Sequence, residues 1–446
     1  MKPPSRQAAP GPRVGRLIRD LPRIAREPHR WLLDLRNEYG DVVRLPFGAR
    51  SSAYLISHPR DIHRILTHRW KNYPKAPLFR RLSQLGFGRG LVNSEGDLWQ
   101  TQRRTLQPFF HGAELERFGQ ALESETARTI DRWNQAGDLR CPLDLESEML
   151  DLLMRITSRA LFGRGLGDLV RPARQAFLAA ARDSLWAGRL PTPAWIKVRR
   201  THAQLRARMH EVLADVAAAT TQPAPMLHAL RHTREPRSGL PMSEDQLLDE
   251  MVTLLFTGVE TSALTLTWLW YLMERHPEEQ TRARRELENR VGHAPPTWNG
   301  AEGLDFLEAM IHEALRLYPP SWANGRQAKA ADELGGYYIP AGSRVILSQY
   351  VVHRHPDYWP DPESFRPSRF LHQGRFRLEP FSYFPFGAGP RHCLGQELAE
   401  VEIRLTMAIL LPRFRLRFVS SDPVPIDPMV TLRPRRPIKV VPEAVS

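Results

Sequence analysis

The chain has 446 residues and a net charge of +14, from 63 lysines and arginines against 49 aspartates and glutamates. Its two cysteines exclude a disulfide framework and suit a reducing compartment, so we expect a cytoplasmic protein. The basic residues are spread over most of the chain and form no recognised nucleic-acid module, which argues against a nucleic-acid partner.

No Ser/Gly linker, repeat or low-complexity run divides the chain after its first dozen residues. We therefore predict a single domain over residues 1–446, with residues 1–13 disordered. The first twelve residues have no apolar core, so we expect neither a signal peptide nor a membrane anchor there.

The first pair of interest is Trp99 and Arg103, which lie one helical turn apart after the loop 93–97. By itself this spacing is typical of a tryptophan and an arginine that stack on a protein surface. It carries functional meaning only if other features of the chain support it.

A long helix is predicted over residues 244–275. Ser243 and Gln246 form a capping box before it, and Pro277 follows its end. Between Met251 and Met273 the only charged residue is Glu260, so a membrane span has to be considered. A carboxylate near the middle of a span costs about 2.5–3.5 kcal/mol, and six threonines and serines make the segment polar, which favours a buried core helix.

The middle of this helix contains Gly258, which weakens a helix by about 1 kcal/mol relative to alanine. Thr261 can donate its hydroxyl to the carbonyl of Thr257, one turn back, and open the helix locally. Glu260 and Thr261 together supply an ionisable group and a hydroxyl, a pair suited to proton transfer. The alternative is that these small residues only let another helix approach.

Glu313 and Arg316 are spaced i,i+3 on a helix predicted over residues 305–317. Such a pair is ordinarily a solvated salt bridge worth about 0.2–0.5 kcal/mol. Downstream, residues 336–347 contain two short strand-like segments around a Pro-Ala-Gly turn. His355 follows in a loop, where a histidine is more often a packing or hydrogen-bonding residue than a ligand.

The segment 386–395 places Cys393 where a glycine-rich loop enters a helix, a setting that favours the thiolate. Gly387 permits unusual backbone geometry, and the guanidinium of Arg391 can form two parallel hydrogen bonds with a carboxylate. Three interpretations compete: a buried hydrophobe, a nucleophile with a base such as His392, and an axial ligand of haem iron. Composition alone does not choose between them.

The same ten residues resemble the haem-binding signature of the cytochrome P-450 family. All five fixed positions of that signature are filled, by Phe386, Gly389, Arg391, Cys393 and Gly395. The resemblance implies a soluble bacterial-type member that is mainly α-helical with a small β subdomain. In this fold the haem lies between a long central helix and the cysteine-containing loop.

The resemblance also implies roles for the residues above. Cys393 would ligate the iron, Arg391 would pair with a haem propionate, and Phe386 would pack beside the thiolate. Further contacts to the haem are expected from Gly387, Gly395, Trp99, Arg103, Arg326 and, weakly, His355.

The family's oxygen-activation signature corresponds to the middle of the long helix, so Glu260 and Thr261 would be catalytic. Thr257 stands where the family usually has alanine or glycine. Glu313 and Arg316 would form a structural triad with Arg369, although Ser368 replaces the usual glutamate beside it.

The implied function is insertion of one oxygen atom of O2 into a hydrophobic small molecule, such as a fatty acid or terpenoid, at haem b. Only about 50 residues follow Cys393, too few for a fused reductase, so electrons from NAD(P)H would come through a ferredoxin or flavodoxin with its reductase. A monomer is expected. A haem-thiolate peroxygenase or isomerase and a non-catalytic haem sensor remain alternatives. The substrate pocket would include Phe79, Phe87, Phe256, Thr257 and Trp322.

Overall fold

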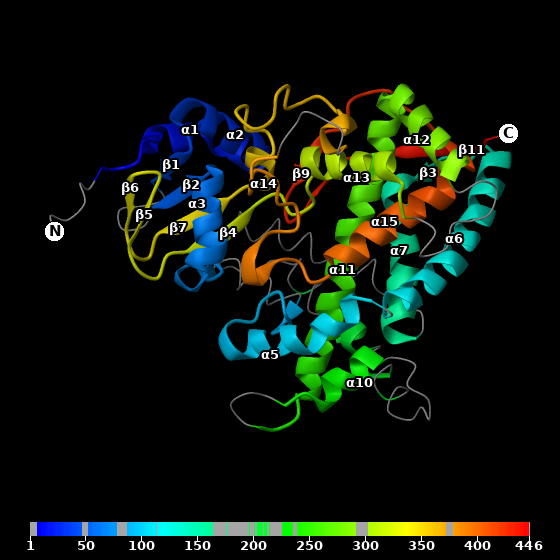
Figure 1. Cartoon of the computed structure of the whole chain (residues 1–446), viewed down its shortest axis with the longest axis horizontal. Helices are drawn as coiled ribbons and strands as arrows, with labels where there is room; N and C mark the ends of the chain where they lie inside the picture. The colour runs from blue at the N-terminus through cyan, green and yellow to red at the C-terminus, as the bar shows by residue number, and fades with distance from the viewer. Residues whose placement is uncertain are drawn as a thin grey trace. The chain divides into compact units, whose positions relative to one another are not determined.

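The computed structural model describes residues 7–46, 52–77, 87–112, 114–163, 225–234, 239–290, 302–371 and 378–445, with part of the segment from 175 to 214. Contacts divide the chain into two units, each assembled from three stretches. The first unit comprises Met1–Arg80, Ala309–Cys393 and Val424–Arg435, and the second Arg81–Glu308, Leu394–Pro423 and Arg436–Ser446. Helices dominate and the strands are short, as the fold class predicted from the sequence requires (Figure 1).

The first unit contains all but one of the described sheets. Its elements are α1 (Val14–Arg26), α2 (Pro28–Tyr39), β1 (Val42–Leu45), β2 (Ala53–Ile56), α3 (Pro59–His63), η1 (Arg64–His68), η2 (Trp70–Asn72), most of α13 (Asp305–Leu317), β4 (Asn324–Gln327), β5 (Asp332–Leu334), β6 (Tyr337–Ile339), β7 (Arg344–Leu347), α14 (Gln349–Val352), η6 (Pro367–Phe370), η7 (Gly389–Arg391), β9 (Ile426–Pro428) and β10 (Leu432–Pro434).

The four-stranded sheet of this unit has the order β1-β2-β7-β4, with β2 and β7 parallel and the other neighbours antiparallel. Every side chain of β2 is buried because both faces of the sheet are covered. Tyr54 and Ile56 join one apolar cluster, which includes Ile62 of α3. Leu55 joins another, which includes Leu35 of α2. Because successive side chains of a strand point to opposite faces of the sheet, β2 contributes to an apolar core on each face.

Residues 7–13, for which disorder is predicted, have described contacts with the first unit. The amide of Arg44 donates to the carbonyl of Pro10 at 2.7 Å, and Ala9 is 7% exposed. A side chain at Gly11 would clash with the carbonyl of Arg44. The segment thus lies against β1, an arrangement that composition alone does not reveal.

The second unit is mainly helical. Its elements are α5 (Gly96–Leu106), η3 (Gln107–Phe110), α6 (Glu114–Asp138), β3 (Leu143–Asp144), α7 (Leu145–Phe162), α10 (Pro225–His232), α11 (Glu244–Arg275), α12 (Pro277–Arg290), α15 (Gln396–Leu410), β8 (Phe414–Phe418) and β11 (Lys439–Ala444). The strands form a sheet in the order β3-β11-β8. The longest described helix, α11, packs against α7 and α15.

Helix α11 has the bounds that its capping residues predict. The Ser243 hydroxyl accepts from the amide of Gln246 at 3.3 Å, and Pro277 begins the next helix. Among the described helices, α11 passes a length and composition test for a membrane span, but 78% of its apolar window is buried. This burial agrees with the core helix predicted from its polar residues.

The two strand-like segments of residues 336–347 are strands β6 and β7, as predicted, with Gly342 at positive φ in the turn between them. They belong to different sheets, however. Strand β6 pairs with β5, whereas β7 lies between β2 and β4. Long-range pairing rather than the local turn therefore sets their partners.

Candidate active site

The cysteine loop of the first unit closes on itself, because the amide of Cys393 donates to the carbonyl of Phe386 at 2.9 Å. The Cys393 side chain is exposed. Gly389 has a φ of +68°, and a side chain there would clash with the carbonyl of Leu66 in η1. Gly387 has a φ of +71° and open space where a Cβ would stand. The loop thus combines an exposed thiol with a glycine that leaves room for a flat group.

Helix α15 begins at Gln396, so Cys393 lies in the loop three residues before the helix. Arg391 ends η7 and is partly buried. A Cβ on Gly395 would lie 3.5 Å from the ring of Phe110, an ordinary contact.

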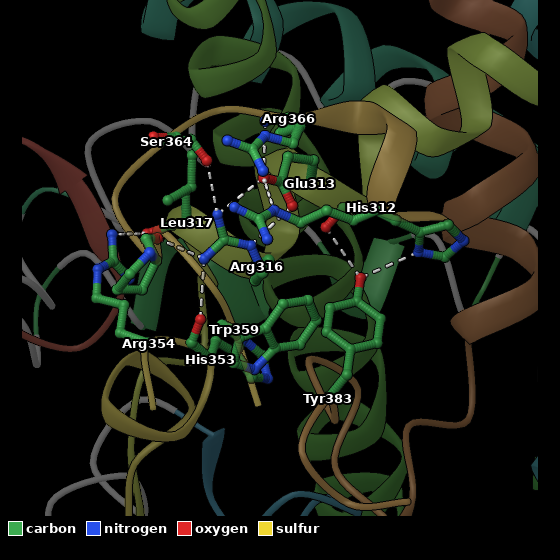
Figure 2. Close-up of polar contacts among 12 residues, drawn as sticks. His312, Glu313, Arg316, Leu317, His353, Arg354, Trp359, Ser364, Arg366 and Tyr383 are labelled. Atoms are coloured by element: carbon green, nitrogen blue, oxygen red, sulfur yellow. Dashed lines mark hydrogen bonds and ion pairs between the residues drawn. The ribbon is translucent and has the colours of Figure 1, made fainter. Parts of the chain in front are cut away.

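Glu313, Arg316 and Arg369 come together in the interior of the first unit, and we call them the brace. Figure 2 shows Glu313 and Arg316 side by side. The Arg316 Nε and a terminal nitrogen donate to the two oxygens of Glu313 at 2.7 and 2.8 Å. Arg369 Nε donates to the same carboxylate at 3.3 Å. Glu313 and Arg316 are both 0% exposed, so the pair is not the solvated surface bridge that i,i+3 spacing usually gives.

Arg316 also fixes the chain downstream of α14. Its remaining N–H groups donate to the carbonyls of His353 at 2.9 Å and Ser364 at 3.0 Å (Figure 2). The last of them donates to the carbonyl of Pro362 at 2.7 Å. With the two bonds to Glu313, all five guanidinium donors have acceptors, which is what a buried arginine requires. The brace therefore holds three backbone positions to one helix.

The residues just before the cysteine loop are held by contacts that the sequence did not indicate. The Tyr383 hydroxyl donates to the carbonyl of His312 at 3.1 Å (Figure 2). The amide of Phe384 donates to Nε2 of His353 at 3.1 Å. Burial, and then the charge of Arg316, lowers the pKa of His353 well below its usual value, so its ring is a neutral acceptor. These contacts connect the loop to α13 and the brace.

His355 is a buried, hydrogen-bonded histidine of the first unit. The side chain is fully buried, and Arg36 donates to its Nδ1 at 3.0 Å. Its Nε2 lies 2.9 Å from the Asp41 carboxylate. Burial would raise the pKa of Asp41, but the hydrogen bond from His355 and the charge of Arg36 hold it below its usual value. His355 is thus a structural link to the N-terminal part of the first unit.

Two further predicted residues lie at partly buried positions of the first unit. Arg326 sits in β4 opposite Val345 of β7. Trp322 packs against the apolar cluster that includes Leu35, and its ring centroid is 6.3 Å from that of His29. Trp322 therefore contributes to core packing in the first unit.

In the second unit, the middle of α11 is partly uncovered. Every residue from Gln246 to Met273 is buried except Thr257, Gly258 and Thr261. The Thr261 hydroxyl donates to the carbonyl of Thr257 at 2.9 Å, as predicted. The helix nevertheless continues through this point, which does not support the predicted local opening.

The neighbours of this uncovered stretch carry the other predicted groups of the second unit. Glu260 is 9% exposed. The rings of Phe256 and Phe87 meet edge to face, with centroids 6.1 Å apart, so two predicted pocket residues do lie together. Trp99 and Arg103 lie on α5, where Trp99 is buried and Arg103 partly buried. Phe79 lies outside the described residues.

A polar cluster ties the loop after Phe87 to α5 and α11, and we call it the loop clamp. Gln102 and Gln246 both donate to the carbonyl of Arg89, at 3.1 and 2.9 Å. Glu250 accepts from the amide of Leu91 at 3.1 Å. These three side chains are at most 2% exposed, and each has one buried oxygen without a donor.

Within the loop clamp, Glu250 has a raised pKa. Burial, with a smaller contribution from the charge of Asp249, raises the pKa of Glu250 to about 8. A proton on this carboxyl supplies a hydrogen-bond donor where several oxygens lack one. Burial also raises the pKa of Glu402 on α15 to about 8.

The comparison with solved structures supports the fold. The chain matches the crystal structure of the cytochrome P450DA heme domain with a TM-score of 0.86, over 99% of this chain and 98% of that one, at 21% identity. It matches the crystal structure of a cytochrome P450 named CYP102L1 with a TM-score of 0.85, over 99% and 100% of the two chains, at 22% identity.

Sequence comparison gives the family. The family model described as Cytochrome P450 matches residues 8–442. The chain is 32% identical over 405 residues to cyclooctat-9-en-7-ol 5-monooxygenase of Streptomyces melanosporofaciens, covering 89% of this chain and 86% of that protein. It is 28% identical over 427 residues to pentalenene oxygenase of Streptomyces avermitilis, covering 93% and 92%.

The chain therefore belongs to the cytochrome P450 family and is a monooxygenase, an oxidoreductase. Family membership implies a haem, the use of O2 and electrons from a partner. Each unit, taken by itself, fits that cofactor. The first offers the exposed Cys393 thiol and the open space at Gly387, and the second offers the uncovered residues of α11.

Proposed function

We propose that Cys393 is the axial ligand of haem b and that the enzyme hydroxylates a terpenoid. The observation that carries the proposal is the exposed thiol in a loop closed by the bond from its own amide to Phe386. A thiolate ligand to haem iron pushes electron density that favours O–O cleavage. The brace acts indirectly, because Arg316 holds the carbonyl of His353, and the ring of His353 accepts from the amide of Phe384 just before this loop.

The haem carboxylates would be held by arginines. Arg103 and Arg391 are partly buried, so charge-assisted bonds to them are less screened than on an open surface. Arg326 and the indole of Trp99 are further candidates. The open space at Gly387 would accommodate the flat face of the cofactor, with Phe386 and Gly395 beside it in the chain.

Thr261 and Glu260 would handle protons. Because the Thr261 hydroxyl already donates to the carbonyl of Thr257, its oxygen keeps lone pairs that can accept a hydrogen bond from water. Glu260, buried next to it in the chain, would exchange protons with that water. This division gives Thr261 the role of holding the water and Glu260 the role of proton carrier.

A terpenoid substrate is supported by two observations. The relatives named above are a cyclooctat-9-en-7-ol monooxygenase and a pentalenene oxygenase, and both act on terpenoids. In this chain Phe87 and Phe256 present aromatic surface beside the uncovered part of α11, with Thr257 next in the chain. An apolar wall with few polar groups suits a hydrocarbon skeleton better than a charged molecule.

Electrons would come from NAD(P)H through a ferredoxin or flavodoxin and its reductase. A net charge of +14 on this chain would speed encounter with an acidic donor, and added salt would slow it. We propose that the enzyme acts as a cytoplasmic monomer.

The deciding experiment is the absorption spectrum of the reduced, carbon-monoxide-bound protein. A thiolate-ligated haem gives a Soret band at long wavelength, which Cys393→Ser should lose. Cys141→Ser is the matched control, because Cys141 is also exposed and should leave the band unchanged. A Cys393→Ser protein that kept the band would contradict the ligand assignment.

The substrate class is tested in the same preparation with a ferredoxin system and 18O2. A cyclic terpene alcohol should yield product carrying one labelled oxygen atom. Conversion of fatty acids alone would overturn the terpenoid assignment while leaving the thiolate assignment intact.

A further inference from the structure

Helix α1 in the first unit exposes an apolar stripe. Val14, Ile18 and Leu21 are 56%, 62% and 53% exposed, although most large apolar side chains of the described residues are buried. At about 100° per residue these three fall within an arc of about 60° on the helix surface. The neighbouring arc, with the buried Leu17 and the partly buried Ile24, packs on the apolar cluster with Leu35. The exposed stripe is therefore separate from the face of α1 that packs against the apolar core.

Arginines flank the stripe on its other side. Arg19 and Arg26 lie about 80–100° beyond Ile18 around the helix, and both are exposed. Arg13 precedes the helix and is also exposed. Arg435 donates to the carbonyl of Arg26 at 2.6 Å, which adds a guanidinium at the helix C-terminus.

These cations are largely without internal counter-ions. Among the described residues, Arg13, Arg26 and Arg435 form no ion pair. The one carboxylate of α1, Asp20, is 15% exposed in its side chain and accepts from Trp31 at 3.1 Å and Arg16 at 3.4 Å. Asp20 also lies 3.5 Å from Arg19, whose side chain stays 76% exposed, so Arg19 is the one flanking arginine with a carboxylate beside it.

We propose that α1 is an interfacial helix that docks on a bilayer surface containing anionic lipids. An apolar stripe bordered by arginines matches the acyl boundary and the phosphate layer of such a surface. A second copy of this chain is a poorer occupant, because it would bring the same arginines against each other. Arg16 of α1 donates to Glu38 and to the Tyr39 hydroxyl of α2, so α1 is attached to the neighbouring helix. The two helices lie side by side (Figure 1).

Docking would keep the enzyme beside the phase in which apolar small molecules dissolve. The inference goes beyond the proposed function and does not depend on it. Lipid binding can be measured without substrate or electron donor, so its failure would leave the monooxygenase assignment unaffected.

The test is sedimentation of the full-length holoenzyme with vesicles of phosphatidylglycerol and phosphatidylcholine. The wild-type protein should bind, and Ile18→Gln with Leu21→Gln should weaken binding about tenfold or more. Leu139→Gln with Val419→Gln is the matched control, because these side chains are 72% and 54% exposed elsewhere. The control should bind like wild type, and unchanged carbon monoxide spectra should show that both variants are folded.

Substitutions of the arginines distinguish binding to an anionic lipid surface from binding to another partner. Arg19→Gln and Arg26→Gln should each weaken binding roughly fivefold at low salt, and pure phosphatidylcholine vesicles should bind little. Equal binding by wild type and the Ile18/Leu21 variant would overturn the proposal. So would absence of vesicle binding, whether or not sedimentation velocity showed that the stripe joins two copies of the chain.

Discussion

Glu313 in the first unit and Glu250 in the second are both fully buried glutamates on long helices, yet their surroundings differ. Glu313 receives two bonds from the Arg316 guanidinium, at 2.7 and 2.8 Å, and is a paired anion. Glu250 receives one bond, from the amide of Leu91, and burial raises its pKa to about 8. The same residue type is therefore an ion in the brace and a neutral acid in the loop clamp.

The difference lies in which neighbours the fold supplies. A buried carboxylate next to a guanidinium is stabilised as a charge, whereas one among amide oxygens is stabilised by a proton. The brace should therefore lose its stabilising effect when the Arg316 guanidinium is removed. The loop clamp should lose its stabilising effect when Glu250 is deprotonated.

The largest effect is expected for Arg316→Ala, which removes both of the shorter bonds to the buried Glu313 carboxylate and leaves it only the longer ion pair with Arg369 at 3.3 Å. The same change leaves three backbone carbonyls without donors. Removing one partner of a buried pair costs about 3–5 kcal/mol. We expect little folded, haem-loaded protein, measured as soluble yield and thermal unfolding.

The matched control is Arg366→Ala, because the Arg366 side chain pairs with Asp361 at 2.9 Å on the surface. Loss of such an exposed pair changes stability by at most about 1 kcal/mol. If Arg316→Ala unfolded no more easily than Arg366→Ala, the brace would not be the anchor described above.

The sequence predicted the parts of the molecule that depend on neighbours along the chain. The bounds of α11 follow from its cap and the proline after it, and the Glu313–Arg316 pairing follows from i,i+3 spacing. The partner of His355 could not be predicted in this way, because Arg36 lies 319 residues away. The loop clamp was missed for the same reason, since Gln246 bonds a carbonyl 157 residues away. Contacts of this range depend on tertiary packing, which has no local pattern.

The loop clamp gives a pH dependence of stability whose sign can be derived. The pKa of Glu250 is higher in the folded protein, about 8, than its ordinary value of 4.5. The folded state therefore holds the proton more tightly, and the stabilisation is lost as pH rises from about 4.5 to about 8. At most, the difference amounts to about 4–5 kcal/mol. Glu250→Gln should remove this contribution and raise stability at pH 8 relative to wild type.

Denaturant unfolding of wild type and Glu250→Gln at several pH values measures this effect. Glutamine keeps an acceptor for Leu91 and supplies a permanent donor to the amide oxygens. Glu288→Gln, at an exposed position of α12, is the control and should parallel wild type. Parallel curves for Glu250→Gln and wild type would mean that Glu250 is ionised in the folded protein.

Substitutions of two threonines on α11 should have smaller effects, one on catalysis and the other on stability. Thr261 is partly exposed, whereas Thr265 is 2% exposed, although both hydroxyls donate to a carbonyl one turn back at 2.9 Å. Thr261→Ala removes the oxygen proposed to hold water, so about tenfold less product should form per O2 consumed, with peroxide released instead. Its thermal stability should change by less than about 1 kcal/mol.

Thr265→Ala should show the opposite behaviour, with normal coupling and a loss of about 1 kcal/mol in stability, because it removes a buried hydrogen bond. Thr261→Ser keeps the hydroxyl and should restore coupling. Oxygen uptake, peroxide and product measured together decide the matter. Tight coupling in Thr261→Ala would mean that the uncovered part of α11 holds no proton-relay water, and that Thr261, like Thr265, only completes the helix.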